Sequence, residues 1–154
     1  MVDKSNYKME ALIKLFNRDL EKLSNEIRSF KNKRNLWKTE GSISNSAGNL
    51  CLHLVGNLNH FIGAIIGDSG YIRRREKEFE STNIDTDKLI ALVNDTNIDV
   101  ISVLKRFDSE RLKANYPIQV FGEDMTYEFF LIHLTTHLNY HLGQINYLRR
   151  MLED

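Results

Sequence analysis

Several features that mark specialised classes of protein are scarce or missing in this sequence. It has a single cysteine, Cys51, so no disulfide can form within the chain, which agrees with a reducing compartment. No apolar run is long enough to cross a membrane, and the N-terminus lacks the hydrophobic core of a signal peptide. Acidic and basic side chains cancel to a formal charge of zero, which gives no electrostatic footprint for nucleic acid. We therefore expect a cytoplasmic protein without a membrane or nucleic-acid partner.

What the sequence does contain is ordinary for a globular protein. Its 154 residues, 42% of them hydrophobic, are enough for one domain spanning residues 1–154. Apolar residues recur every three or four positions in four stretches, which predicts helices over residues 7–30, 47–66, 87–107 and 127–151. Cys51 lies between two leucines in the second stretch, so we expect a buried and inert thiol rather than a nucleophile.

Side chains that favour helix N-caps precede three of these stretches. They are Asn45 and the serines Ser42, Ser44 and Ser46 for the second helix, Asp85 or Thr86 for the third and Thr126 for the fourth. Residues 71–83 have mixed charge and predict an ordered loop or a short surface helix. Residues 108–125 contain the only proline and predict an extended excursion or a small hairpin. The fold class is therefore all-α: a four-helix bundle with a long connection between helices two and three and a short extended excursion before helix four.

The histidines are the main candidates for chemistry. His133, His137 and His141 are four residues apart, so on a helix they occupy neighbouring turns, each rotated by about 40° from the last. A lone histidine on a helix is usually structural, but three at this spacing favour a pair or a triple of metal ligands. The other two, His53 and His60, lie on the second predicted helix. Since bundle helices pack about 8–10 Å apart, imidazoles from both helices can reach one ion.

Two familiar metal sites are excluded by the neighbours of these histidines. A zincin needs a glutamate directly after the first histidine, but leucine follows both His133 and His137. A bundle di-iron site needs two Glu-x-x-His motifs, and the sequence has none. The remaining prediction is a mononuclear, histidine-rich site, and imidazole ligands suit zinc, nickel, copper or ferrous iron.

Two short motifs resemble the DinB-like, or YfiT-like, metalloenzyme family, the damage-inducible bundle family that is unrelated to the DNA polymerase of that name. They are the stretch around His53 (Leu52-His53-Leu54-Val55-Gly56-Asn57) and the pair His137-x-x-x-His141 followed by Gly143-Gln144. The Arg-rich segment ending in Glu78-Phe79-Glu80 is similar to a subgroup of small bacterial members. The chain departs from the commonest family pattern, His-His-Arg-Gly-Gln, by having Tyr140 and Leu142 around the last histidine.

The resemblance implies a site and a class of reaction. His53, His137 and His141 would hold one divalent metal ion, with water in the other positions. Related proteins include thiol-dependent transferases, in which the metal binds a low-molecular-weight thiol and lowers its pKa. The implied function is thus a metal-dependent S-transferase that acts on small electrophiles in stress or detoxification. The alternative is a non-catalytic bundle, stabilised by metal or binding a small ligand, and a third reading is that the histidines are buried polar groups without metal.

Four more polar residues share the helix stripes of these histidines. For His60 and His133 a structural or pocket-lining role is favoured over contact with the ligands. Asn57 and Gln144 are equally compatible with a hydrogen bond to a ligand or substrate and with a structural hydrogen bond between helices. The first predicted helix, basic and apolar, offers a face for a homodimer.

Overall fold

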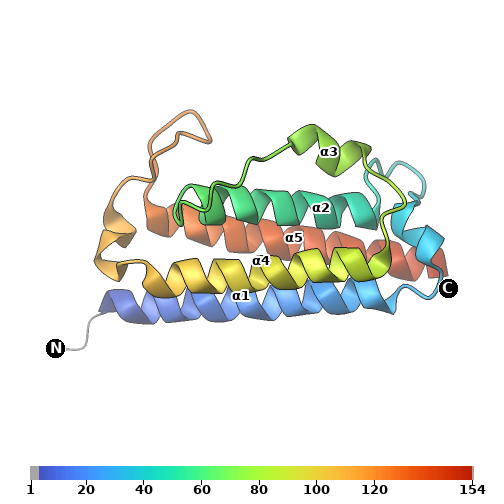
Figure 1. Ribbon diagram of the computed structural model, residues 1–154, viewed down its shortest axis with the longest axis horizontal. Helices are drawn as coiled ribbons and strands as arrows, with labels where there is room; N and C mark the ends of the chain where they lie inside the picture. The colour runs from blue at the N-terminus through green and yellow to red at the C-terminus, as the bar shows by residue number, and fades with distance from the viewer. Residues whose placement is uncertain (1–3, 154) are drawn as a thin grey trace.

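The computed structural model describes residues 4–153, and its regular secondary structure is helical, without a strand in that range. Four long helices form a bundle, as expected (Figure 1). Four shorter helical segments lie in the connections. The long helices are α1 (Lys4–Ser29), α2 (Ala47–Leu58), α4 (Thr86–Arg106) and α5 (Tyr127–Glu153). The short segments are the 3₁₀ helices η1 (Lys33–Trp37) and η3 (Ser109–Lys113), the π-helix η2 (Asn59–Ala64) and the α-helix α3 (Arg75–Glu80).

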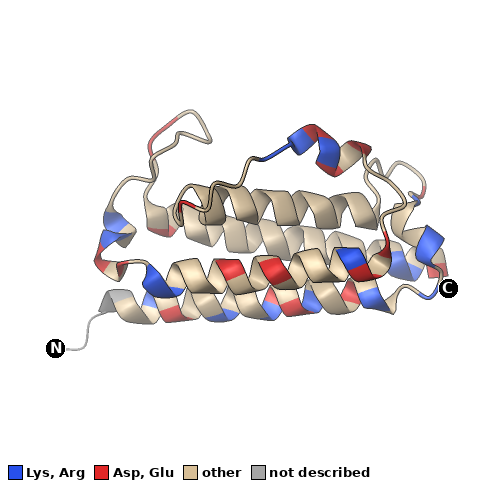
Figure 2. Cartoon of the chain, viewed as in Figure 1, with Lys and Arg blue, Asp and Glu red and all other residues tan. Residues whose placement is uncertain are grey.

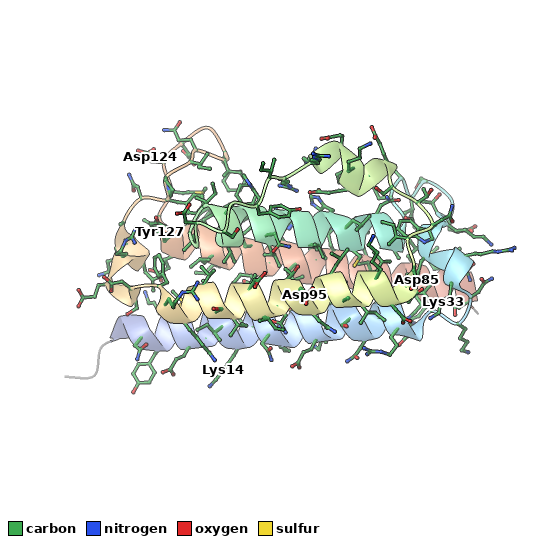
Figure 3. All side chains as sticks on the ribbon, in the orientation of Figure 1. Lys14, Lys33, Asp85, Asp95, Asp124 and Tyr127 are labelled. Atoms are coloured by element: carbon green, nitrogen blue, oxygen red, sulfur yellow. The ribbon has the colours of Figure 1, made fainter. Side chains whose placement is uncertain are left out.

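In the bundle, α1 and α2 lie diagonally opposite each other. α1 packs against α4 and α5, and α2 packs against the same two helices from the other side. α1 and α5 run in one direction, α2 and α4 in the other (Figure 1). Asp85 and Tyr127, at the starts of α4 and α5, accordingly lie at opposite ends of the bundle (Figure 3). Since α2 and α4 are parallel, the chain between them has to return along the whole bundle.

The cap predictions are confirmed. The Ser46 hydroxyl accepts a hydrogen bond from the backbone N–H of Asn49, at 3.2 Å, and begins α2. Asp85 accepts one from the N–H of Asp87, at 2.8 Å, and begins α4. The Thr126 hydroxyl accepts one from the N–H of Phe129, at 3.1 Å. Each cap satisfies a backbone donor that the first turn of a helix leaves without a partner.

The second helix is the most enclosed element. All residues of α2 except Leu52 are buried, and the helix carries no Lys, Arg, Asp or Glu, whereas α1 and α4 are striped with charge (Figure 2). Such a helix needs cover on every side. α4, α5 and the short helix α3 provide this cover (Figure 1). The helix predicted to end at residue 66 is in fact two elements: α2 ends at Leu58, and the π-helix η2 follows with a different hydrogen-bond spacing.

The two connections follow the predictions in outline. The segment 71–83 contains the short helix α3, which was one of the two expected forms. Its helix is held down by Asn49, whose amide donates to the carbonyl oxygens of Glu78 and Ser81 at 3.0 and 2.8 Å. The excursion before α5 begins with η3, and its hairpin amounts to a single antiparallel bridge between Asn115 and Thr126. Within residues 4–153, no helix has the length and apolar content needed to span a membrane.

Candidate metal centre

The first histidine of the candidate site, His53, comes from the middle of α2. Its side chain is buried, because the helix turns it toward α5 while α3 covers the outer side. The Nε2 atom lies 3.2 Å from Nε2 of His137, which is 84 positions later in the sequence. The Phe79 ring packs beside the imidazole, with 5.1 Å between ring centroids. Packing thus holds His53 in place from both sides.

The other two histidines come from one stripe of α5. His137 and His141 are one turn apart, and their Nε2 atoms are 3.2 Å from each other. Together with His53 they form the histidine cluster, a term used below for these three residues. One ligand atom from each lies within 4.8 Å of the others. The structure therefore brings together the three residues that the family resemblance implied.

Hydrogen bonds to the Nδ1 atoms of two cluster histidines determine whether their Nε2 atoms carry a hydrogen or an electron pair. Nδ1 of His53 faces the carboxylate of Glu78 at 2.9 Å, and Nδ1 of His141 faces the amide oxygen of Gln144 at 2.7 Å. Each of these partners is an acceptor, and the donor Arg73 Nη2 lies farther from Nδ1 of His53, at 3.4 Å. Each Nδ1 therefore carries the hydrogen, and each Nε2 of the neutral ring carries an electron pair. Two electron pairs therefore point at the Nε2 atom of His137. Such an arrangement needs a cation, or a shared proton, at its centre.

Protonation of the two cluster histidines on α5 is disfavoured. Burial, with the neighbouring His141, His53, His133 and Arg73, lowers the pKa of His137 from 6.5 to about 3. Burial also lowers the pKa of His141, against the opposing effect of the hydrogen bond to Gln144. Both rings are thus neutral at physiological pH, which is the form that binds metals.

The geometry and chemistry of the cluster fit a divalent metal ion. Two ligand nitrogens at about 2.0–2.1 Å from a tetrahedral ion are about 3.3 Å apart, close to the separations in the cluster. Three imidazoles leave at least one coordination position open, which is the pattern of catalytic rather than structural zinc. Imidazole ligation is also compatible with nickel and iron.

Behind His53 lies a pair that the sequence analysis missed. Glu78 of α3 is buried and forms a two-point ion pair with Arg73, with distances of 2.7 and 3.0 Å between their atoms. Burial by itself would raise the pKa of Glu78, but the hydrogen bonds from His53 and Arg73 outweigh it and lower the pKa. The carboxylate is therefore ionised. A carboxylate behind a histidine fixes the ring's tautomer and makes it a stronger metal ligand.

The sequence placed this pair in a segment of mixed charge, which we interpreted as surface. Only Phe79, a large apolar side chain in the middle of the charges, indicated that the segment docks on the bundle. Room for the carboxylate comes from Gly56, because a Cβ atom at this position would collide with Oε1 of Glu78. α3 thus approaches α2 closely at Gly56.

The four secondary candidates lie in different environments. Gln144 accepts the hydrogen bond from Nδ1 of His141, as described above. His133 is one turn before His137 and stacks on Phe130, with 6.0 Å between ring centroids, so its ring is part of an aromatic group. His60 lies in the π-helix against Phe61, and its Nδ1 atom is buried without a hydrogen-bond partner. The Oδ1 atom of Asn57 is likewise buried and without a partner.

Comparison with known proteins places the chain in a family. Residues 3–154 match the family model described as "Protein of unknown function (DUF1572)". A search of functionally curated proteins gave no match. Among solved structures, the fold is similar to a DinB-like protein from Bacillus cereus ATCC 10987. The TM-score is 0.71, the sequence identity is 16%, and the match covers 93% of this chain and 91% of the other. The chain belongs to the DUF1572 family, and its fold is that of the DinB-like proteins.

Proposed function

We propose that the histidine cluster binds one divalent metal ion and that the protein is a metal-dependent enzyme, a thiol-dependent S-transferase acting on small electrophiles in stress or detoxification. The observation that carries the proposal is the convergence of three Nε2 atoms from two helices: those of His53 and His141 each lie 3.2 Å from that of His137. Zinc, nickel and iron all suit this ligand set. A metal ion with an open position lowers the pKa of a bound thiol or water.

The roles of the protein groups follow from their contacts. Glu78 and Gln144 hold the rings of His53 and His141 in one tautomer and one orientation, so that their electron pairs face the centre. The chain's only thiol does not take part, because Cys51 is fully buried and burial raises its pKa to about 12. The reacting sulfur of a transferase reaction therefore has to come from a small thiol that enters the site.

Metal analysis of protein purified without an affinity tag or chelator tests the first half of the proposal. We expect about one divalent ion per chain in the wild type and a large loss in both His53→Ala and His137→Ala. The matched control is His133→Ala, which removes a histidine one turn away on the same helix and should retain the metal. Equal metal content in all four proteins would rule out the site.

A second candidate function is a non-catalytic bundle, stabilised by metal or binding a small ligand. The observation that favours it is that Glu78, the carboxylate bonded to His53, is already engaged by Arg73 and so is not free to act as a base. The two functions are separated by turnover of electrophiles in the presence of small thiols. Turnover that disappears in both the metal-free protein and His53→Ala supports the enzyme, whereas a metal-loaded protein without turnover across a broad panel supports the second function.

A further inference from the structure

A cavity of about 440 Å³ borders the histidine cluster on the side of His141. It lies between the loop that precedes α2 and the C-terminal half of α5, at the end of the bundle where the chain terminates (Figure 1). This loop contains a turn closed by the hydrogen bond from the N–H of Ile43 to the carbonyl of Glu40, at 3.0 Å. The volume is in the range of about 300–1,000 Å³ that is typical of small-molecule sites.

The lining of this cavity is uncharged. Its apolar part consists of Ile43, Leu50, Tyr140, Tyr147, Leu148 and Met151, and neither Lys, Arg, Asp nor Glu lines it. The absence of charge is unusual for this end of the bundle, where Lys and Arg residues gather on η1 and on the last turns of α5 (Figure 2). Arg150 lies over the ring of Tyr147, 5.4 Å from its centre, but does not line the cavity.

Apart from the imidazole of His141, the polar side chains of the cavity carry hydroxyl and amide groups. Ser42, Ser44 and Asn45 contribute them from the loop, and Gln144 contributes its amide from α5. Gln144 also accepts the hydrogen bond from Nδ1 of His141, so one side chain touches both the cavity and the cluster. Groups of this kind orient a ligand by hydrogen bonds without selecting for a charge.

Three large side chains that line the cavity are exposed to solvent. Tyr140 and Tyr147 are 64% and 66% exposed, and Met151 is 54% exposed. Exposed apolar patches of this kind mark binding sites. We infer that the cavity binds the uncharged apolar or aromatic part of the substrate, whose reacting atom lies at the histidine cluster. The inference rests on the proposed function, and it narrows the substrate class to uncharged molecules that carry an apolar group.

Three ligands with the same ring test the substrate class: benzyl alcohol, benzoate and benzylamine, each titrated into zinc-loaded protein and followed by NMR of the backbone amides. We expect saturable shifts from benzyl alcohol at residues 42–45 and 140–151. The two charged analogues should bind at least tenfold more weakly. Benzoate or benzylamine binding as tightly as the alcohol would overturn the uncharged class, and shifts confined to other residues would overturn the site.

The chain offers a closely matched pair of variants for this experiment. Ile43→Trp fills the cavity, while Ile118→Trp makes the same change in a loop at the other end of the bundle. The two isoleucines are 37% and 38% exposed. We expect at least a tenfold loss of benzyl alcohol binding in the first variant and no change in the second. Equal binding in both would contradict the inference. A change of oligomeric state confined to Ile43→Trp would identify the patch as a contact between copies instead.

Failure of the inference is distinguishable from failure of the proposed function. Metal content, measured on the same samples, should be unchanged in both isoleucine variants. A wild-type protein without bound metal would contradict the metal proposal alone. Loading with paramagnetic cobalt instead of zinc then connects the two sites. Bound cobalt should broaden the benzyl alcohol resonances in the wild type. Saturable binding without such broadening would show a cavity separate from the metal centre and overturn the inference.

Discussion

The carboxylate of Glu78 occupies the space that a side chain at Gly56 would fill: a Cβ atom at Gly56 would lie 2.8 Å from Cδ of the glutamate. We therefore predict that Gly56→Ala displaces Glu78 from His53 and weakens metal binding by at least about tenfold, the range found when outer partners of metal ligands are lost. Metal affinity is measured by competition with a chromophoric chelator.

The control for this variant is another helical glycine. Gly143 has no atom within 4 Å of a built Cβ atom, so Gly143→Ala should keep the metal affinity of the wild type. It should also stabilise α5 by about 0.5–1 kcal/mol, since alanine is the better helix former. A loss of affinity shared by both variants would show that the effect is not specific to the contact with Glu78.

Glu78→Gln tests the charge of the same group without changing its size. The amide keeps a possible hydrogen bond but removes the negative charge that strengthens His53 as a ligand, so metal affinity should fall by about 10–100-fold. Glu80→Gln makes the same change at an exposed position of α3 and should have no effect. Calorimetric titration with zinc measures both. Equal affinities would mean that the carboxylate does not support the metal centre.

The stability of the metal-free protein should depend on pH through His137. Burial, first among several causes, lowers its pKa to about 3 in the folded state, while the unfolded chain keeps the ordinary value of 6.5. Between these values the unfolded chain binds a proton that the folded protein does not. Stability is therefore complete above pH 6.5 and is lost as the pH falls, by up to about 1.4 kcal/mol per pH unit from this group.

Urea unfolding in the presence of a chelator, at a series of pH values from neutral to moderately acidic, measures this slope. His137→Gln removes the titrating ring and should flatten the curve in that range. Glu78 does not obscure the result, because its pKa is lowered from 4.5 and it titrates at more acidic pH. A slope that is the same in the wild type and the variant would contradict the prediction.

Cys51 should be unreactive in the folded protein. Its thiol is fully buried and its pKa is raised to about 12 by burial, so almost no thiolate is present at mildly alkaline pH. An aromatic disulfide reagent should react with it only after unfolding in urea. Rapid reaction under native conditions would show that the thiol is accessible and would make Cys51 available to the proposed transferase chemistry.

The fold was predictable because its signals are local. The apolar period of the four long helices and the capping side chains Ser46, Asp85 and Thr126 are properties of neighbouring residues, and all agree with the structure. The pairing of His53 with His137 and His141 depends on which helices are adjacent. Periodicity does not contain that information, and it came from the resemblance to a family.

Two parts of the site were beyond sequence reasoning for physical reasons. Glu78 lies in a segment of alternating charge, which by composition alone is a solvated surface, and its burial depends on the missing side chain of Gly56. His60 was placed on the stripe of His53 by assuming α-helical spacing. What surrounds His60 depends on tertiary packing: its ring lies against Phe61, and the hydrogen-bond spacing changes to that of a π-helix at Asn59.

The parallel course of α2 and α4 also affects how such a protein can change over evolution. It requires a long connection, in which Arg73, Glu78 and Phe79 contact His53 of the histidine cluster. Doubling the length of a loop costs only about 0.6 kcal/mol. Insertions on either side of α3 therefore cost little stability. The group behind His53 can be exchanged or repositioned while the four-helix core, which carries the histidine cluster, remains the same.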